Sequence, residues 1–274
     1  MNTDSRIGEI NRNTKGHLMK IIKYTKKNKN TYEITLENKE IITIYDELIL
    51  KYDLLIIKEL DDYTKKLILE ENTYYEAYYK ALKYLSIKMR TKFEMAKYLS
   101  DYPSNIIDKV ITKLYEENYL NDEKYITSYI NDQINLNNKG YNKILKELEL
   151  MGFDSNTISY YLNLVDHNTW LNNINKYITK KNKHDYKGSS KNYKLKILND
   201  LLNKGYFKED ITQCLDNLEV KDDKSNIIKD YDKAYLNLSK KYQGRELEYK
   251  IKNKLLSKGY DYQTIENLSH EKKA

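Results

Sequence analysis

Three segments of this chain are nearly identical, and each ends in a glycine followed by an aromatic residue. They are KILKELELMGF (143–153), KILNDLLNKGY (196–206) and KIKNKLLSKGY (250–260). Counted back from the glycine, position nine is lysine, position eight isoleucine and position four leucine in every copy. The isoleucine and the leucine lie one helical turn apart and form an apolar stripe. The segments therefore predict an internal repeat with a period of about 53 residues, which must be recognised before any other inference about the fold.

Each copy predicts a helix, a stop and a second helix. Glycine just after the last leucine suits the left-handed conformation that ends many helices, because it has no Cβ atom. The aromatic residue can then fold back on the apolar stripe, and an isoleucine six positions after each glycine (Ile158, Ile211, Ile265) begins the next buried face. Any helical protein can end a single helix in this way, but five matching positions in three copies favour a repeat.

The composition agrees with a helical protein. The 274 residues include one proline and eight glycines, so long helices meet few interruptions. The 29 tyrosines can bury their rings and leave their hydroxyls in water, so we expect part of the core to be tyrosine. Cys214 is the one cysteine, which excludes an internal disulfide and fits a reducing compartment. The sequence has no run of 18 apolar residues and no signal-peptide core, so we expect a cytoplasmic protein with no membrane segment.

The N-terminal part has a different pattern. Residues 1–14 are polar and are predicted to be a disordered tail. Alternating apolar residues over 17–45, with a turn at Asn38–Lys39, predict a small antiparallel sheet. Helices are expected over 46–51 and 61–71, which makes residues 15–72 a small α+β domain.

The strand signals end at residue 72, and four three-helix modules are predicted after it, over 73–121, 122–166, 167–221 and 222–274. In the first module, Thr91 and Glu94 form a capping box, and Met95 and Leu99 stand where the other copies have isoleucine and leucine. The predicted fold class is mainly α: tandem three-helix modules in an elongated curved array, preceded by a small β-containing N-terminal domain.

The order of several motifs resembles the RecX family of recombination regulators. The motifs are ALKYLSIKMRTKFEMAKYL (81–99), VITKLYEENYLND (110–122) and KGYNKILKELELMGF (139–153). The resemblance covers about residues 74–265, and the N-terminal sheet is similar to the extension of members from low-GC bacteria. It implies a monomer of helical modules that binds the RecA filament on DNA, limits its growth or promotes its disassembly, and so restrains strand exchange and the SOS response to DNA damage. Some members also contact DNA directly, so single- or double-stranded DNA is a second expected partner.

The charge distribution allows a partner of this kind. The net charge is +7, and the excess of basic residues lies after residue 166. The basic residues of this chain are mostly lysines, which hold a phosphate as point charges and not with the bidentate fork of arginine. We expect basic residues at helix starts and links to form the partner surface, namely Lys88, Arg90, Lys92, Lys139, Lys143, Lys187, Lys194, Lys196, Arg245 and Lys250. Two alternatives remain: these side chains are simply solvated helix ends, or the chain binds nucleic acid as a helical-repeat protein without a recombinase.

The sequence contains no pattern for catalysis. It has no phosphate-binding glycine loop, and its four histidines lie far apart (His17, His167, His184, His270). Cys214 and Trp170 stand beside periodic apolar residues, so we interpret both as core residues. We therefore expect neither an enzyme nor a cofactor or metal site.

Overall fold

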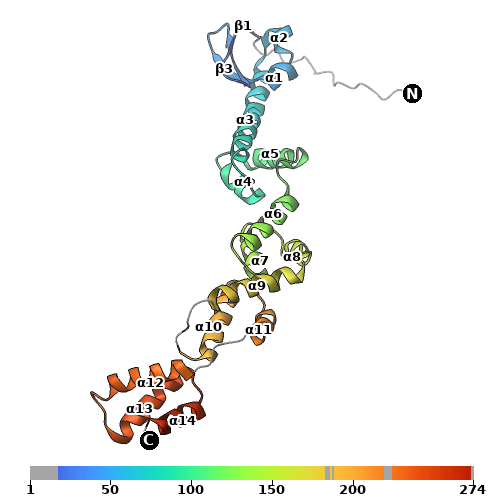
Figure 1. The fold of residues 1–274 in the computed structure, drawn as a ribbon. Helices are drawn as coiled ribbons and strands as arrows, with labels where there is room; N and C mark the ends of the chain where they lie inside the picture. The colour runs from blue at the N-terminus through green and yellow to red at the C-terminus, as the bar shows by residue number, and fades with distance from the viewer. Residues whose placement is uncertain (1–17, 183–185, 187, 219–223, 273–274) are drawn as a thin grey trace. The chain divides into compact units, whose positions relative to one another are not determined.

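The structure is a computed structural model that describes residues 18–182, 186, 188–218 and 224–272. The predicted tail 1–14 and Lys187 lie outside these residues. The chain is mainly α-helical with one small antiparallel sheet at its N-terminal end, which confirms the predicted fold class (Figure 1). It divides into two compact units, Met1–Asp122 and Glu123–Ala274.

The first unit begins with the predicted sheet. Strands β1 (Met19–Lys26), β2 (Thr31–Leu36) and β3 (Ile41–Tyr45) pair in antiparallel fashion, and β4 (Glu59–Leu60) adds to the free edge of β1. Lys39 adopts a φ of 69° in the turn before β3, as predicted. Alternate residues of β2 and β3 are buried, so one face of the sheet carries the core of this unit.

Helix α1 (Asp46–Lys51) follows β3 as expected, but the short α2 (Leu54–Ile57) and the strand β4 were not anticipated. The residues of this segment read LLIIKEL, and so short an apolar run does not distinguish a helix from a strand.

The predicted helix end near residue 71 is wrong, because α3 (Asp62–Leu85) continues through it. The segment has no glycine or proline to end a helix. The Asn72 side chain instead accepts a hydrogen bond from the Tyr45 N–H at 3.1 Å and donates to the Thr43 carbonyl, which ties the helix to β3. The Thr73 hydroxyl donates to the Leu69 carbonyl at 3.2 Å, one turn back in the same helix. Both polar side chains are thus accommodated without a break.

Helices α4 (Lys92–Tyr98) and α5 (Ser104–Glu116) complete the first unit. The capping box is confirmed: the Thr91 hydroxyl accepts from the Glu94 N–H, and the Glu94 carboxylate accepts from the Thr91 N–H, both at 3.0 Å. Met95 and Leu99 are fully buried against the second half of α3 and α5, as their alignment with the repeat requires.

The second unit consists of three successive helix triplets, and we call these the second, third and fourth modules. The helices are α6 (Asp122–Asn135), α7 (Tyr141–Leu150) and α8 (Ser155–Asn163); α9 (His167–Asn182), α10 (Ser190–Asn203) and α11 (Lys208–Asp216); α12 (Lys224–Leu238), α13 (Gly244–Ser257) and α14 (Tyr262–Glu271). Whether each module is a separate domain stays a prediction.

The repeated glycines end the second helix of each module, as predicted. Gly152, Gly205 and Gly259 have φ angles of 92°, 90° and 85°. In each case the N–H of the next, aromatic residue donates to the carbonyl of the leucine four positions before the glycine, at 3.2–3.3 Å. Tyr206 and Tyr260 are thereby buried on the apolar stripe. The repeat is therefore a helix-ending device whose stripe is core.

One continuous core joins the second and third modules. It includes the stripes of α7 and α10, and Trp170 and Cys214 belong to it, which confirms their interpretation as core residues. Burial raises the pKa of the Cys214 thiol, so the group stays protonated. The fourth module has its own cluster around Ile251 and Leu255.

The start of α7 packs on the end of α10, and we call this contact the joint. The Gly140 N–H donates to the Lys204 carbonyl at 2.8 Å, and the Asn142 N–H donates to the Gly205 carbonyl at 2.9 Å. The backbones approach so closely that a Cβ atom on Gly140 would lie 2.4 Å from the Tyr206 nitrogen, and one on Gly205 would lie 2.3 Å from the Lys143 nitrogen. Only glycine fits both sides of the joint.

The third and fourth modules meet in a related way. Ser189 caps α10, and both its N–H and its hydroxyl donate to the Lys258 carbonyl, at 3.4 and 3.0 Å. Lys258 precedes Gly259 just as Lys204 precedes Gly205. The contact is looser in its backbone hydrogen bond, and a serine is tolerated where the joint has Gly140.

Exchange of Gly140 for serine separates local capping from the joint. Gly140 is the N-cap of α7 with a φ of −91°, which any residue adopts, and serine is at least as good a cap as glycine. Local structure therefore predicts an equal or higher stability. We expect instead a loss of about 1–3 kcal/mol, because the added side chain overpacks the joint. The measurement is chemical denaturation followed by circular dichroism, and a variant as stable as the parent would show that the joint does not form.

Candidate functional site

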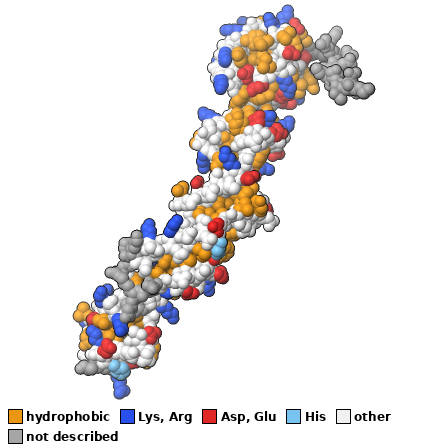
Figure 2. Space-filling view, turned by 45° about the vertical axis from the view of Figure 1, so that its right-hand side comes forward, with side chains coloured by type: hydrophobic (Ala, Val, Ile, Leu, Met, Phe, Trp, Pro, Cys, Tyr) orange, Lys and Arg blue, Asp and Glu red, His pale blue; other side chains and the backbone are white. Residues whose placement is uncertain are grey.

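Half of the predicted basic surface is freely presented to solvent. Exposed side chains are found at five of the ten positions, namely Lys92, Lys143, Lys196, Arg245 and Lys250. Lys88 is also largely exposed and lies 3.9 Å from the Glu94 carboxylate. On the face drawn in Figure 2, Lys and Arg side chains occur in both units and are interspersed with Asp and Glu. No single basic face dominates that view, so individual sites must be judged by their surroundings.

Arg90 is held by the first unit. Its side chain is 12% exposed, and its guanidinium lies 3.8 Å from the centre of the Tyr84 ring and 3.4 Å from the Glu94 carboxylate. The Tyr84 ring in turn stacks on Tyr98 with centroids 3.9 Å apart. This arrangement stabilises the capped start of α4 and leaves little of Arg90 for a partner.

Lys139 and Lys194 also make contacts within the protein. The Lys139 ammonium donates to the Glu147 carboxylate at 2.7 Å, and the Tyr129 hydroxyl donates to the same carboxylate at 2.8 Å. Burial alone would raise the pKa of Glu147, but these hydrogen bonds outweigh it and hold the pKa below its usual range. The Lys194 ammonium donates to the Leu215 carbonyl at the end of α11, at 2.9 Å. Both lysines therefore join helices of their own modules.

A basic cavity that the sequence analysis missed lies beside the joint. Its volume is about 640 Å³, and four lysines line it; we call it the lysine cavity. Its lining residues are Ile134, Asn135, Asn138, Asn173, Lys176, Tyr177, Lys180, Lys181 and Lys204. The spacing of Lys176 and Lys180 puts them on one face of α9 and could have been noticed. That Lys204 joins them depends on the packing of α10 against α9, which local pattern does not reveal.

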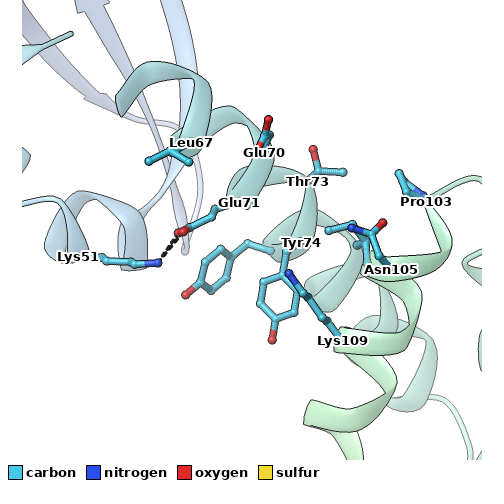
Figure 3. A pocket seen from close by; sticks show the side chains of 11 residues that line it. Lys51, Leu67, Glu70, Glu71, Thr73, Tyr74, Pro103, Asn105 and Lys109 are labelled. Atoms are coloured by element: carbon cyan, nitrogen blue, oxygen red, sulfur yellow. Dashed lines mark hydrogen bonds and ion pairs between the residues drawn. The ribbon is translucent and has the colours of Figure 1, made fainter. Parts of the chain in front are cut away.

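A second cavity, of about 550 Å³, lies in the first unit between α1, α3 and α5 (Figure 3). Tyr74 and Tyr75 line it, and Lys109 of α5 extends toward it. Lys51 pairs with Glu71 at 2.6 Å on its α1 side. Because its cations and anions are balanced, this cavity has no clear preference for a charged ligand.

Two classes of site were also sought among the described residues. In the described ranges, no group of three or more His, Cys, Asp or Glu side chains is placed to hold a metal ion. Nor is any described helix long and apolar enough to cross a membrane.

Known proteins resemble the chain along almost its whole length. A family model described as "RecX, first three-helix domain" matches residues 77–114, which span the second half of α3, α4 and most of α5. The regulatory protein RecX of Streptococcus agalactiae is 33% identical over 261 residues, covering 92% of this chain and 99% of the relative. The chain belongs to the RecX family.

Further relatives agree with this assignment. The regulatory protein RecX of Bacillus cytotoxicus is 32% identical over 254 residues, covering 90% of this chain and 94% of the relative. A crystal structure of regulatory protein RecX shares the fold with a TM-score of 0.63 over 73% of this chain and 100% of its own, at 24% identity. The RecX structure from Lactobacillus salivarius has a TM-score of 0.50 and 29% identity, covering 54% of this chain and 97% of its own.

The Lys139–Glu147 pair makes a pH-dependent prediction for this RecX-family chain. Because the pKa of Glu147 is lowered in the folded state, its contribution is present above its unfolded pKa of about 4.3 and is lost as the pH falls through the folded value. We expect Lys139→Gln to cost about 1 kcal/mol at pH 7 and progressively less in acid. Denaturation at several pH values measures this, with Lys146→Gln, an exposed position on α7, as the control. A cost that does not change with pH would contradict the pairing.

Proposed function

We propose that this protein regulates the RecA recombinase by binding the RecA–DNA filament and limiting its extension or activity. The observation that carries the proposal is the full-length similarity to proteins named regulatory protein RecX, which spans 92% of this chain and 99% of the Streptococcus agalactiae relative. Matching of whole lengths argues that the N-terminal sheet and all four modules serve one shared role. The protein acts as a cytoplasmic monomer in this proposal, and restrains DNA repair by recombination and the SOS response.

The repeat supplies a surface suited to a filament. Lys143, Lys196 and Lys250 stand nine positions before the glycine in their modules, and all three are exposed. A filament presents the same protomer surface again and again, so charges repeated from module to module can meet successive protomers. Lys92 and Arg245 are exposed at other helix starts and can add to this surface. The proposed mechanism needs binding alone and no chemical step.

Two modes of inhibition differ in stoichiometry. A protein that blocks the growing end of a filament acts with few molecules, whereas one that fills the groove along the filament needs many. We favour the first mode, since a chain with four modules can occupy an end with several contacts at once.

The direct test is RecA-dependent ATP hydrolysis on single-stranded DNA, with the recombinase of the same species. We expect inhibition well below equimolar amounts of this protein. Inhibition that requires stoichiometric amounts would favour groove occupancy, and a complete lack of inhibition would contradict the proposed function.

A triple exchange in the same assay tests the surface. Lys143, Lys196 and Lys250 are replaced by glutamine, and the matched control replaces Lys146, Lys191 and Lys254, which are exposed on the same three helices. The first variant should inhibit less than the parent, with the larger difference at low salt, where attraction is least screened. Equal inhibition by both variants would place the contact elsewhere.

A further inference from the structure

The lysine cavity has an excess of positive charge that the protein does not neutralise. Lys181 lies 3.6 Å from the Asp200 carboxylate, which also accepts a hydrogen bond from the Tyr177 hydroxyl at 2.9 Å. Within the described part of the chain, Lys176, Lys180 and Lys204 form no ion pair. Three ammonium groups thus surround one concave space without a counter-charge from the protein, and such a space attracts an anion.

The polar groups between the lysines are positioned by the joint. The Asn138 carboxamide oxygen accepts from the Tyr206 hydroxyl at 2.7 Å, which directs its amide nitrogen away from that bond as a donor. The Asn173 amide donates to the Ile134 carbonyl at 3.2 Å and fixes the end of α6 against α9. The cavity wall is therefore ordered, and it offers donors together with cations.

The corresponding lysine of the fourth module has a different environment. Lys258 precedes Gly259 as Lys204 precedes Gly205, but its ammonium is bound by the Asp230 carboxylate. The Tyr260 hydroxyl donates to the same carboxylate at 3.0 Å. The Lys204 ammonium instead lies 5.7 Å from the centre of the Tyr177 ring. An unneutralised cavity is thus a property of the third module and not a consequence of the repeat.

The chemistry favours the phosphates of a flexible strand. Lysine binds phosphate as a point charge, whereas carboxylates of a protein partner are matched best by the fork of arginine, which the cavity lacks. Duplex DNA is stiff over about 150 base pairs and does not bend into a local hollow of this size, but a single strand does. Lys181 and Lys204 both lie over the Tyr177 ring, so that ring is not open for a base to stack on it.

We propose that the lysine cavity binds the sugar–phosphate backbone of a single-stranded nucleic acid, with Lys176, Lys180 and Lys204 as the phosphate contacts. Binding is independent of base sequence, because the contacts go to the backbone. The inference goes beyond the proposed function, since it needs no recombinase and gives the protein a hold of its own on the strand.

The test is fluorescence anisotropy of a labelled thymidine oligonucleotide of about 20 nucleotides, longer than a typical single-strand site, titrated with the full chain at several salt concentrations. For single strands the logarithm of the binding constant falls with the logarithm of salt by about 0.7 for each phosphate contact. Replacing Lys176, Lys180 and Lys204 by glutamine should therefore reduce this slope by about two.

The control removes the same charge elsewhere. Lys229, Lys233 and Lys240 are exposed on or just after α12, outside the cavity, and their exchange for glutamine should leave the slope unchanged. The double exchange of Lys176 and Lys180 alone, both on the exposed side of α9, is the second variant should the triple one fold poorly. Equal slopes for the cavity and control variants, tighter binding of a duplex than of the single strand, or no binding by the parent at low salt would each overturn the proposal. None of these results depends on the ATP hydrolysis assay, so the proposed function stands or falls separately.

Discussion

The joint between the start of α7 and the end of α10 is the contact on which the second unit depends. The first amides of a helix and its last carbonyls have no partners within that helix. Here the amides of Gly140 and Asn142 meet the carbonyls of Lys204 and Gly205, so each helix end satisfies the other. The positive end of one helix dipole also faces the negative end of the other, which adds a favourable electrostatic contribution. Two modules are thereby connected through their backbones as well as through their shared core.

The position of the joint explains why a cavity forms beside it. Tyr206 follows Gly205 directly, packs edge-on against Trp170 and donates its hydroxyl to Asn138 in the link before α7. Lys204 immediately precedes the same glycine and lines the cavity with the lysines of α9. The glycine that ends α10 thus sets the place of a buried aromatic ring on one side and of an exposed cation on the other. The same element of the repeat serves packing and charge presentation.

Much of this architecture could be predicted from the repeat, because a glycine with a positive φ after an apolar stripe is a local signal. The capping box at Thr91 and Glu94 is equally local, and it was found for that reason. The failures came from contacts between segments distant in sequence. Asn72 keeps α3 continuous by bonding to β3, and Lys139 and Lys194 looked solvated until their partners, Glu147 and Leu215, were visible. The lysine cavity combines α6, α9 and α10, and no single window of sequence contains it.

Amide hydrogen exchange at Gly140 and Asn142 measures the central contact most directly. Neither amide has a partner inside α7, because both belong to its first turn, so protection of either can come only from the joint. Our account predicts that both amides exchange as slowly as those in the interior of α7, such as that of Leu148. Exchange at the rate of an unbonded amide, with the interior of α7 still protected, would show that the second and third modules are not joined in this way. The lysine cavity would then lose its structural basis.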